Sequence, residues 1–301
     1  MNGAGNDFII LDGIKENIDP SLGGAYAAAL CERHLSLGAD GLMLVLPAET
    51  PEADYRMLFF NSDGSMGEMC GNGARCICRY GFESGLSGET QRVLTTAGLV
   101  TGRRIDRRNY RIRLNDPSVT VFSRPVRVDG TVFDCAYVEL GNPGIPHCVL
   151  ELPEKYRGAV SRLLHNGRET EKTESAFGRA AAAFQEDRIL LGELRELGRE
   201  LRYHPVFPKG ANINFFALTG ADRLDLITYE RGVEDFTYAC GTGTGSAVHV
   251  LAAEGLTGKQ QVQVTSRGGL LTVDAAGEGL FLTGPTNIVA AGEILDEELK
   301  L

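Results

Sequence analysis

The sequence lacks tryptophan, an excess of basic residues and any long apolar run. A membrane-spanning helix needs about 20 consecutive apolar residues, so we expect no membrane span. The 40 acidic residues outnumber the 30 lysines and arginines, which makes the formal net charge −10. Because nucleic acids and anionic membrane surfaces attract basic proteins, this charge disfavours both as partners.

Cysteine occurs seven times, an odd number, and without a Cys-x2-Cys pair. That spacing is typical of zinc sites and of redox pairs, so we expect no bound metal. The first residues do not resemble a secretory signal, and we expect thiols in a reducing cytoplasm. Five cysteines are expected to pack as small hydrophobes: Cys31, Cys76, Cys78, Cys135 and Cys148.

Glycine is abundant, with 38 of 301 residues, which indicates many tight turns and close backbone approaches. Short apolar or alternating runs predict strands at 8–11, 42–46, 55–60, 93–96, 110–114, 119–122, 126–128, 136–140, 213–218, 224–229, 261–265, 270–273 and 280–282. Helices are expected from Tyr26 to Leu37, with Gly38 as the stop, and within 153–203, where leucines recur at helical spacing. This pattern predicts an α+β class with short, hairpin-linked strands rather than parallel strand–helix–strand units.

The chain repeats itself at a distance of 170 residues. Cys70-Gly-Asn-Gly aligns with Cys240-Gly-Thr-Gly, and nine of the 29 positions from 70 to 98 are identical without a gap. The aligned pairs further along include Gly85 and Gly255, Gln91 and Gln261, Thr95 and Thr265, and Gly98 and Gly268. The repeat predicts two related halves, each with one Cys-Gly-x-Gly turn before a helix. A chance likeness of glycine-rich turns is the alternative.

The two turns predict a specific chemistry. A thiol just before a helix start lies where unpaired N–H groups and the positive end of the helix dipole converge, and this setting favours thiolate. Glycines after it let an anionic ligand reach the amides. Two such turns indicate a carboxylate-bearing carbon held with a thiol on each face. One thiolate then removes the α-proton and the opposite thiol returns a proton, without metal or cofactor.

Six motifs, in order along nearly the whole chain, resemble those of the cofactor-independent diaminopimelate epimerases; they are 2–8 (NGAGNDF), 60–64 (FNSDG), 68–75 (EMCGNGAR), 210–215 (GANINF), 229–232 (YERG) and 239–243 (ACGTG). The resemblance implies an isomerase that interconverts LL- and meso-diaminopimelate without pyridoxal phosphate, in lysine and peptidoglycan precursor biosynthesis. It also implies a cytoplasmic homodimer.

The same resemblance implies a fold of two pseudo-symmetric, strand-rich, barrel-like halves, each around a central helix, with the active site in the cleft between them. We place the halves at 1–117, which carries Cys70, and 118–301, which carries Cys240. This division allows the last strand and the C-terminal tail to pack against the first half.

Residue roles follow from the resemblance, position by position. Cys70 and Cys240 match the acid/base pair, while His147 matches a histidine that tunes the first thiol and Glu230 a glutamate that tunes the second. Asparagines that match substrate-binding positions are Asn6, Asn61 and Asn212. Glu230 and Arg231 match a pair that contacts the amino and distal carboxylate ends. Helix-start residues that hold the α-carboxylate are Gly71, Asn72, Gly241 and Thr242.

Two departures from the family pattern concern the substrate. The family reads Gly-Asn-Pro-His before the histidine, whereas this chain reads Gly-Asn-Pro-Gly-Ile-Pro-His over 141–147. Alignment on the histidine puts Ile145 where an asparagine is expected, and Asn142 reaches the site only if the loop bulges. In addition, the charged helical stretch 155–193 is inserted relative to the family spacing, which indicates a surface excursion, a lid or an oligomer contact.

Three other functions remain open at this stage. Within the family, the substrate could be another polar amino acid such as histidine. Outside it, the two cysteines could serve a thiol redox protein, or the helix ends could belong to an amino-acid binding protein. Deuterium incorporation at the α-position separates an epimerase from both of these.

Overall fold

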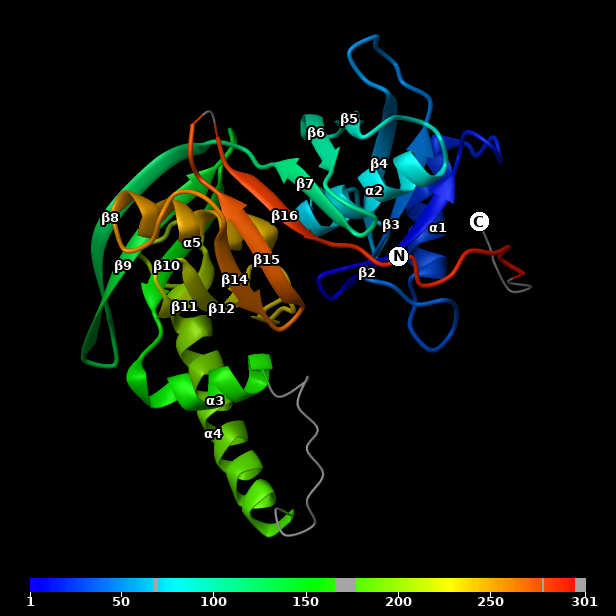
Figure 1. Cartoon of the computed structure of the whole chain (residues 1–301). Coiled ribbons are helices and arrows are strands. Elements are labelled where there is room, and N and C mark those ends of the chain that lie inside the picture. Colours follow the sequence, from blue (N-terminus) through cyan, green and yellow to red (C-terminus); the bar gives the residue numbers. More distant parts are fainter. Residues whose placement is uncertain (68–69, 166–176, 278, 296–301) are drawn as a thin grey trace. The chain divides into compact units, whose positions relative to one another are not determined.

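The computed structural model describes residues 1–67, 70–165, 177–277 and 279–295. The chain divides into two compact units, Met1–Arg113 with Phe281–Leu301, and Leu114–Leu280 (Figure 1). The first unit therefore ends at Arg113 instead of residue 117. The closing segment belongs with the first unit because its strand β16 (Phe281–Pro285) pairs with β7 (Asn109–Arg113).

The first unit is a mixed sheet. In order along the sheet, its strands are β1 (Asn2–Gly3), β2 (Asn6–Asp12), β3 (Gly41–Leu46), β4 (Tyr55–Asn61), β5 (Thr90–Thr95), β6 (Gly98–Arg104), β7 and β16. The pairs β2–β3 and β4–β5 are parallel, and the other neighbours are antiparallel. Parallel neighbours need a crossover connection. The short 3₁₀ turn Pro20–Leu22 with α1 (Gly23–Leu30) supplies the first crossover, and α2 (Gly71–Glu83) supplies the second.

The second unit follows the same plan. Its strands are β8 (Pro117–Val128), β9 (Thr131–Leu140), β10 (Ile145–Glu151), β11 (Asn212–Gly220), β12 (Arg223–Glu230), β14 (Val262–Ser266) and β15 (Gly269–Asp274), with β13 (Asp235–Phe236) paired to β12. The pairs β10–β11 and β12–β14 are parallel. The first crossover contains α3 (Glu154–His165) and α4 (Phe177–Arg202), and the second contains α5 (Gly241–Ala253).

Most neighbouring strands are antiparallel, as the hairpin-linked pattern predicted, but the four parallel pairs show that strand–helix–strand crossovers occur as well. The alternation of apolar residues marks where a strand lies, but it does not reveal the direction of the neighbouring strand. In the described part of the chain, five α-helices accompany the strands, so the fold is a strand-rich mixture of helix and sheet. Within those same residues, no helix is long and apolar enough to cross a membrane.

Helix α1 is shorter than the sequence predicted. It covers Gly23–Leu30 and ends before the expected stop at Gly38. His34 adopts a φ of 78°, which a right-handed helix cannot contain, so the apolar pattern continues past the point where the backbone has already left the helix.

Helices α2 and α5 occupy equivalent positions in the two units. Each spans 13 residues and connects the third and fourth strands of a parallel–antiparallel–parallel series. Helix α2 is buried along most of its length against β1, β2, β5, β6, β7 and β16, and α5 packs against β9, β10, β11 and β15. Strands from widely separated parts of each sheet therefore surround one helix.

The repeat is real in three dimensions, but its spacing changes along the chain. Gly85 and Gly255 have φ values of 75° and 74° just after the two helices, as a shift of 170 requires. Beyond them, Thr95 pairs with Gly98 across a turn, whereas the equivalent pair is Ser266 with Gly269, a shift of 171. The second unit thus carries one extra residue before β14. The expected equivalences of Gln91 with Gln261, Thr95 with Thr265 and Gly98 with Gly268 are wrong by one position.

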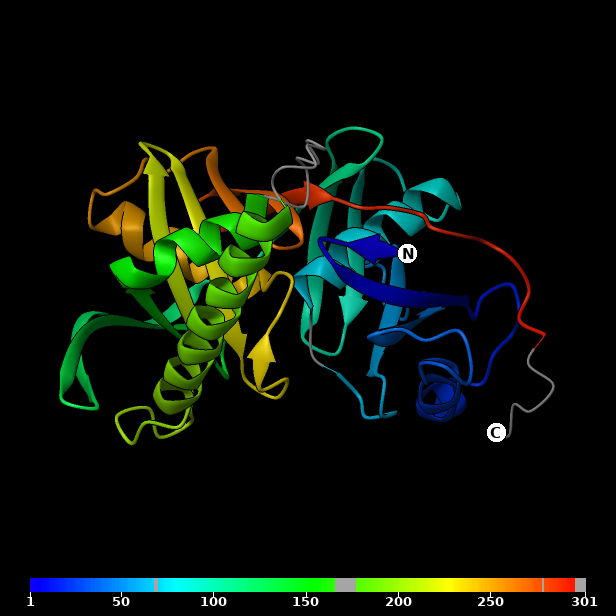
Figure 2. The ribbon, with the colours of Figure 1, turned by 90° about the horizontal axis from the view of Figure 1, so that it is seen from below.

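The insertion is more than a surface excursion. Helix α3 packs against the long α4, which extends beyond it (Figures 1 and 2). Tyr156, Val160, Leu194 and Leu201 are buried in a core cluster with Phe215 of β11. Residues 166–176 of the expected insertion lie outside the described part of the chain. The two helices contribute core packing to the second unit, which their polar composition alone did not indicate.

Candidate active site

Cys70 is the N-cap residue of α2. Its backbone is extended, with φ −100° and ψ 121°, and its side chain is half-buried. Gly73 cannot carry a side chain, because an added Cβ would overlap the terminal methyl group of Met43. The glycines after Cys70 therefore let the first turn of α2 lie against the sheet of the first unit.

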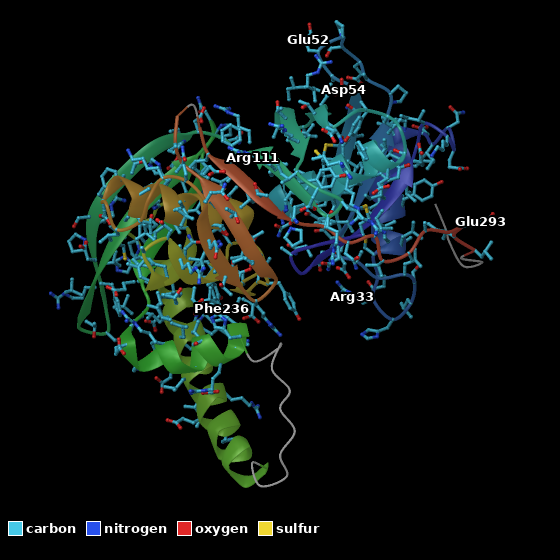
Figure 3. All side chains as sticks on the ribbon, viewed as in Figure 1. Arg33, Glu52, Asp54, Arg111, Phe236 and Glu293 are labelled. Atoms are coloured by element: carbon cyan, nitrogen blue, oxygen red, sulfur yellow. The ribbon has the colours of Figure 1, made fainter. Side chains whose placement is uncertain are left out.

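A chain of side-chain amides leads from the first turn of α2 to the surface. Asn72, which is 1% exposed, donates from Nδ2 to Oδ1 of Asn6 at 2.7 Å. Asn6 donates in turn to Oδ2 of Asp40 at 3.0 Å. Arg33, which is labelled in Figure 3, pairs with the same carboxylate at 2.9 Å and with Asp7 at 2.7 Å. The structure thus joins two of the predicted substrate-binding residues, Asn6 and Asn72, in one hydrogen-bonded chain.

Asn61 lies at the end of β4 and is exposed. Its side-chain amide donates to the Ser65 hydroxyl at 2.9 Å, and its backbone N–H donates to the Ser65 carbonyl at 2.9 Å.

Cys240 has nearly the same local geometry as Cys70. It is the N-cap of α5, with φ −103° and ψ 112°. Its sulfur accepts the Gly243 backbone N–H at 3.4 Å and lies 3.5 Å from the Thr242 hydroxyl. The side chain is buried, with 8% exposure. Both cysteines therefore lie at the positive end of a helix dipole, where the first backbone N–H groups have no partner within the helix.

Asn212 and Arg231 form one rigid corner of the second unit. The Asn212 side-chain oxygen accepts the Arg231 backbone N–H at 2.8 Å, and its Nδ2 donates to the Pro146 carbonyl at 3.1 Å. The exposed Arg231 guanidinium donates to the Lys209 carbonyl at 3.3 Å. Neighbouring Glu230 accepts the Thr237 hydroxyl at 2.8 Å. This places the Glu230–Arg231 pair between β11 and the segment that leads to Cys240.

Helix α4 braces the turn that follows Arg231. Arg202 pairs with Glu234 at 3.1 Å, and the same carboxylate accepts the Gly232 backbone N–H at 3.0 Å. Arg195 pairs with Asp235 at 2.8 Å. Helix α4 thus supports the turn from which Arg231 extends.

His147 lies in β10 and has no exposed surface. Its Nδ1 lies 3.3 Å from the side-chain nitrogen of Asn214, which can only donate, so the proton of the neutral ring is on Nε2. Burial, with the Arg231 charge as the second cause, lowers the pKa of His147 to about 3. Nε2 has no hydrogen-bond partner among the described residues. His147 is therefore a neutral donor rather than a cation.

Asn214 is a site residue that the sequence analysis missed. Besides His147, its Nδ2 donates to the Cys148 carbonyl at 2.9 Å and the Asn212 carbonyl at 3.1 Å, and its Oδ1 accepts the Thr228 hydroxyl at 3.0 Å. A Cβ on Gly243 would overlap that same oxygen. Asn214 therefore links His147 to the first turn of α5. Its spacing of two from Asn212 on one strand, which puts both on the same face, is the signal that could have found it.

The loop before His147 places its two candidate residues differently. Asn142 is exposed, whereas Ile145 is half-buried and begins β10 opposite Leu140.

All seven cysteines lie within the described residues and are thiols rather than disulfides. In that same part of the chain, no group of three His, Cys, Asp or Glu side chains is arranged to hold a metal ion.

Solved structures with the same fold belong to the PhzF proteins and the proline racemases. A PhzF-family phenazine biosynthesis protein of Bacillus anthracis matches with a TM-score of 0.60 and 15% identity over 95% of this chain and 92% of that one. A hydroxyproline epimerase of Agrobacterium vitis matches with a TM-score of 0.55 and 19% identity over 93% and 83%. The chain therefore shares the fold of these proteins.

Sequence comparison identifies the family. The sequence profile described as diaminopimelate epimerase matches residues 1–113 and 184–289. Diaminopimelate epimerases of Aquifex aeolicus and Archaeoglobus fulgidus are 32% and 33% identical over 311 and 314 aligned residues, which cover 100% of this chain and 98% and 96% of theirs. The chain belongs to the diaminopimelate epimerase family, a family of amino-acid isomerases. This confirms the resemblance found in the motifs.

Proposed function

We propose that the chain inverts one α-carbon of diaminopimelate, interconverting the LL and meso forms, with Cys70 and Cys240 as the two acid/base groups. The observation that carries the proposal is the matched geometry of these two cysteines. Each is the N-cap of a 13-residue helix that occupies the equivalent place in one of two related units. Family membership supports the substrate.

The proposed reaction moves one proton at each face of the carbon. A thiolate removes the α-proton and becomes a thiol, while the thiol on the opposite face donates its proton to the carbanion and becomes a thiolate. The backbone N–H groups of Gly71, Asn72, Gly241 and Thr242 stabilise the negative charge that develops on the α-carboxylate. Because the two faces need one thiol each, the proposed reaction requires both Cys70 and Cys240.

The other predicted site residues have defined tasks in this proposal. Asn6, Asn61 and Asn212 bind the substrate, and Glu230 binds its amino end and tunes Cys240. His147 donates from Nε2 and tunes Cys70. None of these steps uses a metal ion or pyridoxal phosphate.

The distal end of the substrate is assigned to Arg231. Its backbone is held by Asn212 at 2.8 Å and its side chain by the Lys209 carbonyl at 3.3 Å, so the guanidinium is fixed in place yet exposed to a ligand. A guanidinium prefers a carboxylate, which it can bind through two parallel hydrogen bonds. This favours diaminopimelate over amino acids such as histidine, lysine or ornithine, which lack a distal carboxylate.

The test is a panel of amino acids incubated with the protein in deuterated water. We expect α-deuterium incorporation and inversion with LL- and meso-diaminopimelate, and much slower exchange with lysine, ornithine and histidine. Equal exchange with histidine would replace the proposed substrate by another polar amino acid. Absence of exchange with every compound would favour a binding or redox protein.

The family resemblance also implies an oligomeric state and a cellular location. We propose a homodimer in the cytoplasm. Light scattering coupled to size-exclusion chromatography tests the dimer, which a mass of one chain would contradict.

A further inference from the structure

Glu139 is a carboxylate of β9 that is buried in the second unit, with 8% exposure. Its Oε1 accepts the Tyr137 hydroxyl at 2.6 Å, and the Lys209 ammonium donates to Oε1 at 3.1 Å and to Oε2 at 3.0 Å. The Tyr137 hydrogen bond, followed by the pairing with Lys209, lowers the pKa of Glu139, so this group is an anion near neutral pH. A buried carboxylate needs such partners, and here they come from two distant segments of the chain.

The loop between α4 and β11, which carries Lys209, is held against strands β8 and β9 at two further points. The Phe207 ring stacks on the Tyr137 ring, with 5.5 Å between the centroids and 13° between the planes. The Val206 carbonyl accepts Nη1 of Arg124 at 3.3 Å, and this guanidinium lies 5.1 Å from the centre of the Tyr137 ring. The loop is therefore fixed to the sheet by side chains as well as by its own backbone.

The position of Glu139 on its strand explains why it reaches this loop. Glu139 and Tyr137 are two residues apart on β9, so both side chains lie on the same face of the sheet. Gly144, in the loop before β10, packs closely on the carboxylate side chain: a Cβ there would come within 2.5 Å of the Glu139 Cβ. Glu139 is thus enclosed and has little freedom to move.

Lys209 connects this carboxylate to the predicted substrate-binding arginine. Its carbonyl accepts Nη1 of Arg231 at 3.3 Å, and Asn212, three residues further on, accepts the Arg231 backbone N–H at 2.8 Å. Burial and the Glu139 acceptor raise the pKa of Tyr137, and the Arg231 charge opposes this rise, which agrees with a guanidinium close to the same cluster. One short segment, held by Glu139, therefore fixes both the backbone and the side chain of Arg231.

We propose that Glu139, through its ion pair with Lys209, is a positioning residue for Arg231 and thereby a determinant of the preference for amino acids with a distal carboxylate. This inference rests on the proposed function, in which Arg231 binds that carboxylate. The ion pair holds the carbonyl that receives Nη1, and this sets the direction in which the guanidinium plane faces a ligand. Two parallel hydrogen bonds to a carboxylate require such a fixed plane.

The first test breaks the ion pair from each side. Glu139→Gln removes the charge and keeps the shape, and Lys209→Met removes the ammonium at a residue whose side chain is 57% exposed. We expect each variant to raise KM for diaminopimelate about three- to tenfold with kcat nearly unchanged, because the distal contact is the same before and during the reaction. If Lys209 itself bound the substrate, Glu139→Gln would free the ammonium and lower KM while Lys209→Met raised it, and this opposite pair of effects would overturn the proposal.

The second test asks whether Glu139 acts through Arg231. In an Arg231→Met background, Glu139→Gln should change kcat/KM by less than about twofold, because the group that it positions is gone. The full loss in that background would indicate general damage to the unit and would overturn the proposal.

Asp134→Asn is the matched control. It makes the same exchange of a carboxylate for an amide on β9, at an exposed residue that accepts the Ser123 hydroxyl at 2.7 Å. We expect wild-type KM and kcat. A rise in KM equal to that of Glu139→Gln would contradict a specific task for Glu139.

Hydrogen–deuterium exchange measured by mass spectrometry tests the positioning without substrate. Glu139→Gln and Lys209→Met should speed exchange in the peptides that cover 206–212 and Arg231, and should leave the peptides of the first unit unchanged. Wild-type exchange at 206–212 and Arg231 in both variants would overturn the proposal.

The kinetic results separate this inference from the function on which it rests. Impaired kinetics for Arg231→Met together with wild-type kinetics for Glu139→Gln would overturn only the task of Glu139. Wild-type kinetics for Arg231→Met would instead overturn the assignment of Arg231 to the distal carboxylate.

Discussion

The side-chain oxygen of Asn212 accepts the backbone N–H of Arg231 at 2.8 Å. This hydrogen bond joins a residue at the start of β11 to one just after β12, although the two lie far apart in the sequence. It fixes the backbone from which the Arg231 side chain extends, and in the proposed reaction this side chain binds the distal carboxylate.

Replacing Arg231 by methionine should weaken the reaction with diaminopimelate selectively. A charge-assisted hydrogen bond is worth about 1.5–3 kcal/mol, so kcat/KM for diaminopimelate should fall roughly 10–150-fold. The preference over lysine should narrow, because lysine has no distal carboxylate. Steady-state kinetics on both compounds check this, and an unchanged preference would argue against the assignment of Arg231.

Cys70→Ala and Cys240→Ala should each abolish inversion while the protein stays folded. Each thiol serves one face of the carbon, so neither can replace the other. Serine should be nearly as harmful, because a hydroxyl is far less acidic than a thiol. Chiral chromatography of the product measures inversion and circular dichroism monitors folding; near-wild-type conversion of LL substrate by either variant would refute the two-base reaction.

Activity should survive extended treatment with a metal chelator and should need no added pyridoxal phosphate. Two helix starts stabilise the developing carboxylate charge in the proposed reaction, so neither group has a task. The measurement is the rate before and after dialysis against chelator, with metal content determined by mass spectrometry. Stoichiometric metal whose removal stops the reaction would contradict this.

Gly243→Ala should disturb the first turn of α5, next to Cys240, because the added methyl group has no room. The new methyl group would overlap Oδ1 of Asn214, which is held by several hydrogen bonds and cannot move freely. Overpacking of this kind costs about 1–3 kcal/mol, and we expect activity to fall with it. Gly192→Ala in α4, where nothing lies within 4 Å, is the control and should stabilise the protein by roughly 0.5–1 kcal/mol. Urea unfolding measures both.

His147 should make stability rise with pH below neutrality. Its folded pKa of about 3 lies below the ordinary value of 6.5, so between these values the unfolded chain binds one more proton than the native state. The free energy of unfolding then increases with pH across this window, by up to about 1.4 kcal/mol per unit. His147→Gln should reduce the slope between pH 4.5 and 6.5, as measured by urea unfolding; an equal slope in both proteins would show that His147 is protonated when folded.

Local sequence was sufficient to predict the two helix-start cysteines and most strands. Cys70 and Cys240 precede Gly-x-Gly, and a helix start depends on residues within one turn of it, so both N-caps could be placed without knowledge of the fold. The strands with clear alternation or continuous apolar runs, such as β3 and β12, were placed for the same reason. The motifs around them led to the family.

Only the tertiary structure decided how these pieces interact. The parallel direction of β10 and β11 brings His147 opposite Asn212 and within reach of Asn214, and no local pattern specifies a partner strand. The ion pair of Glu139 with Lys209 joins β9 to the loop before β11. Likewise the extra residue before β14 is visible only in the strand register. Local propensity acts over a few neighbouring residues, whereas these features depend on contacts between residues distant in the chain, which exist only once the core has packed.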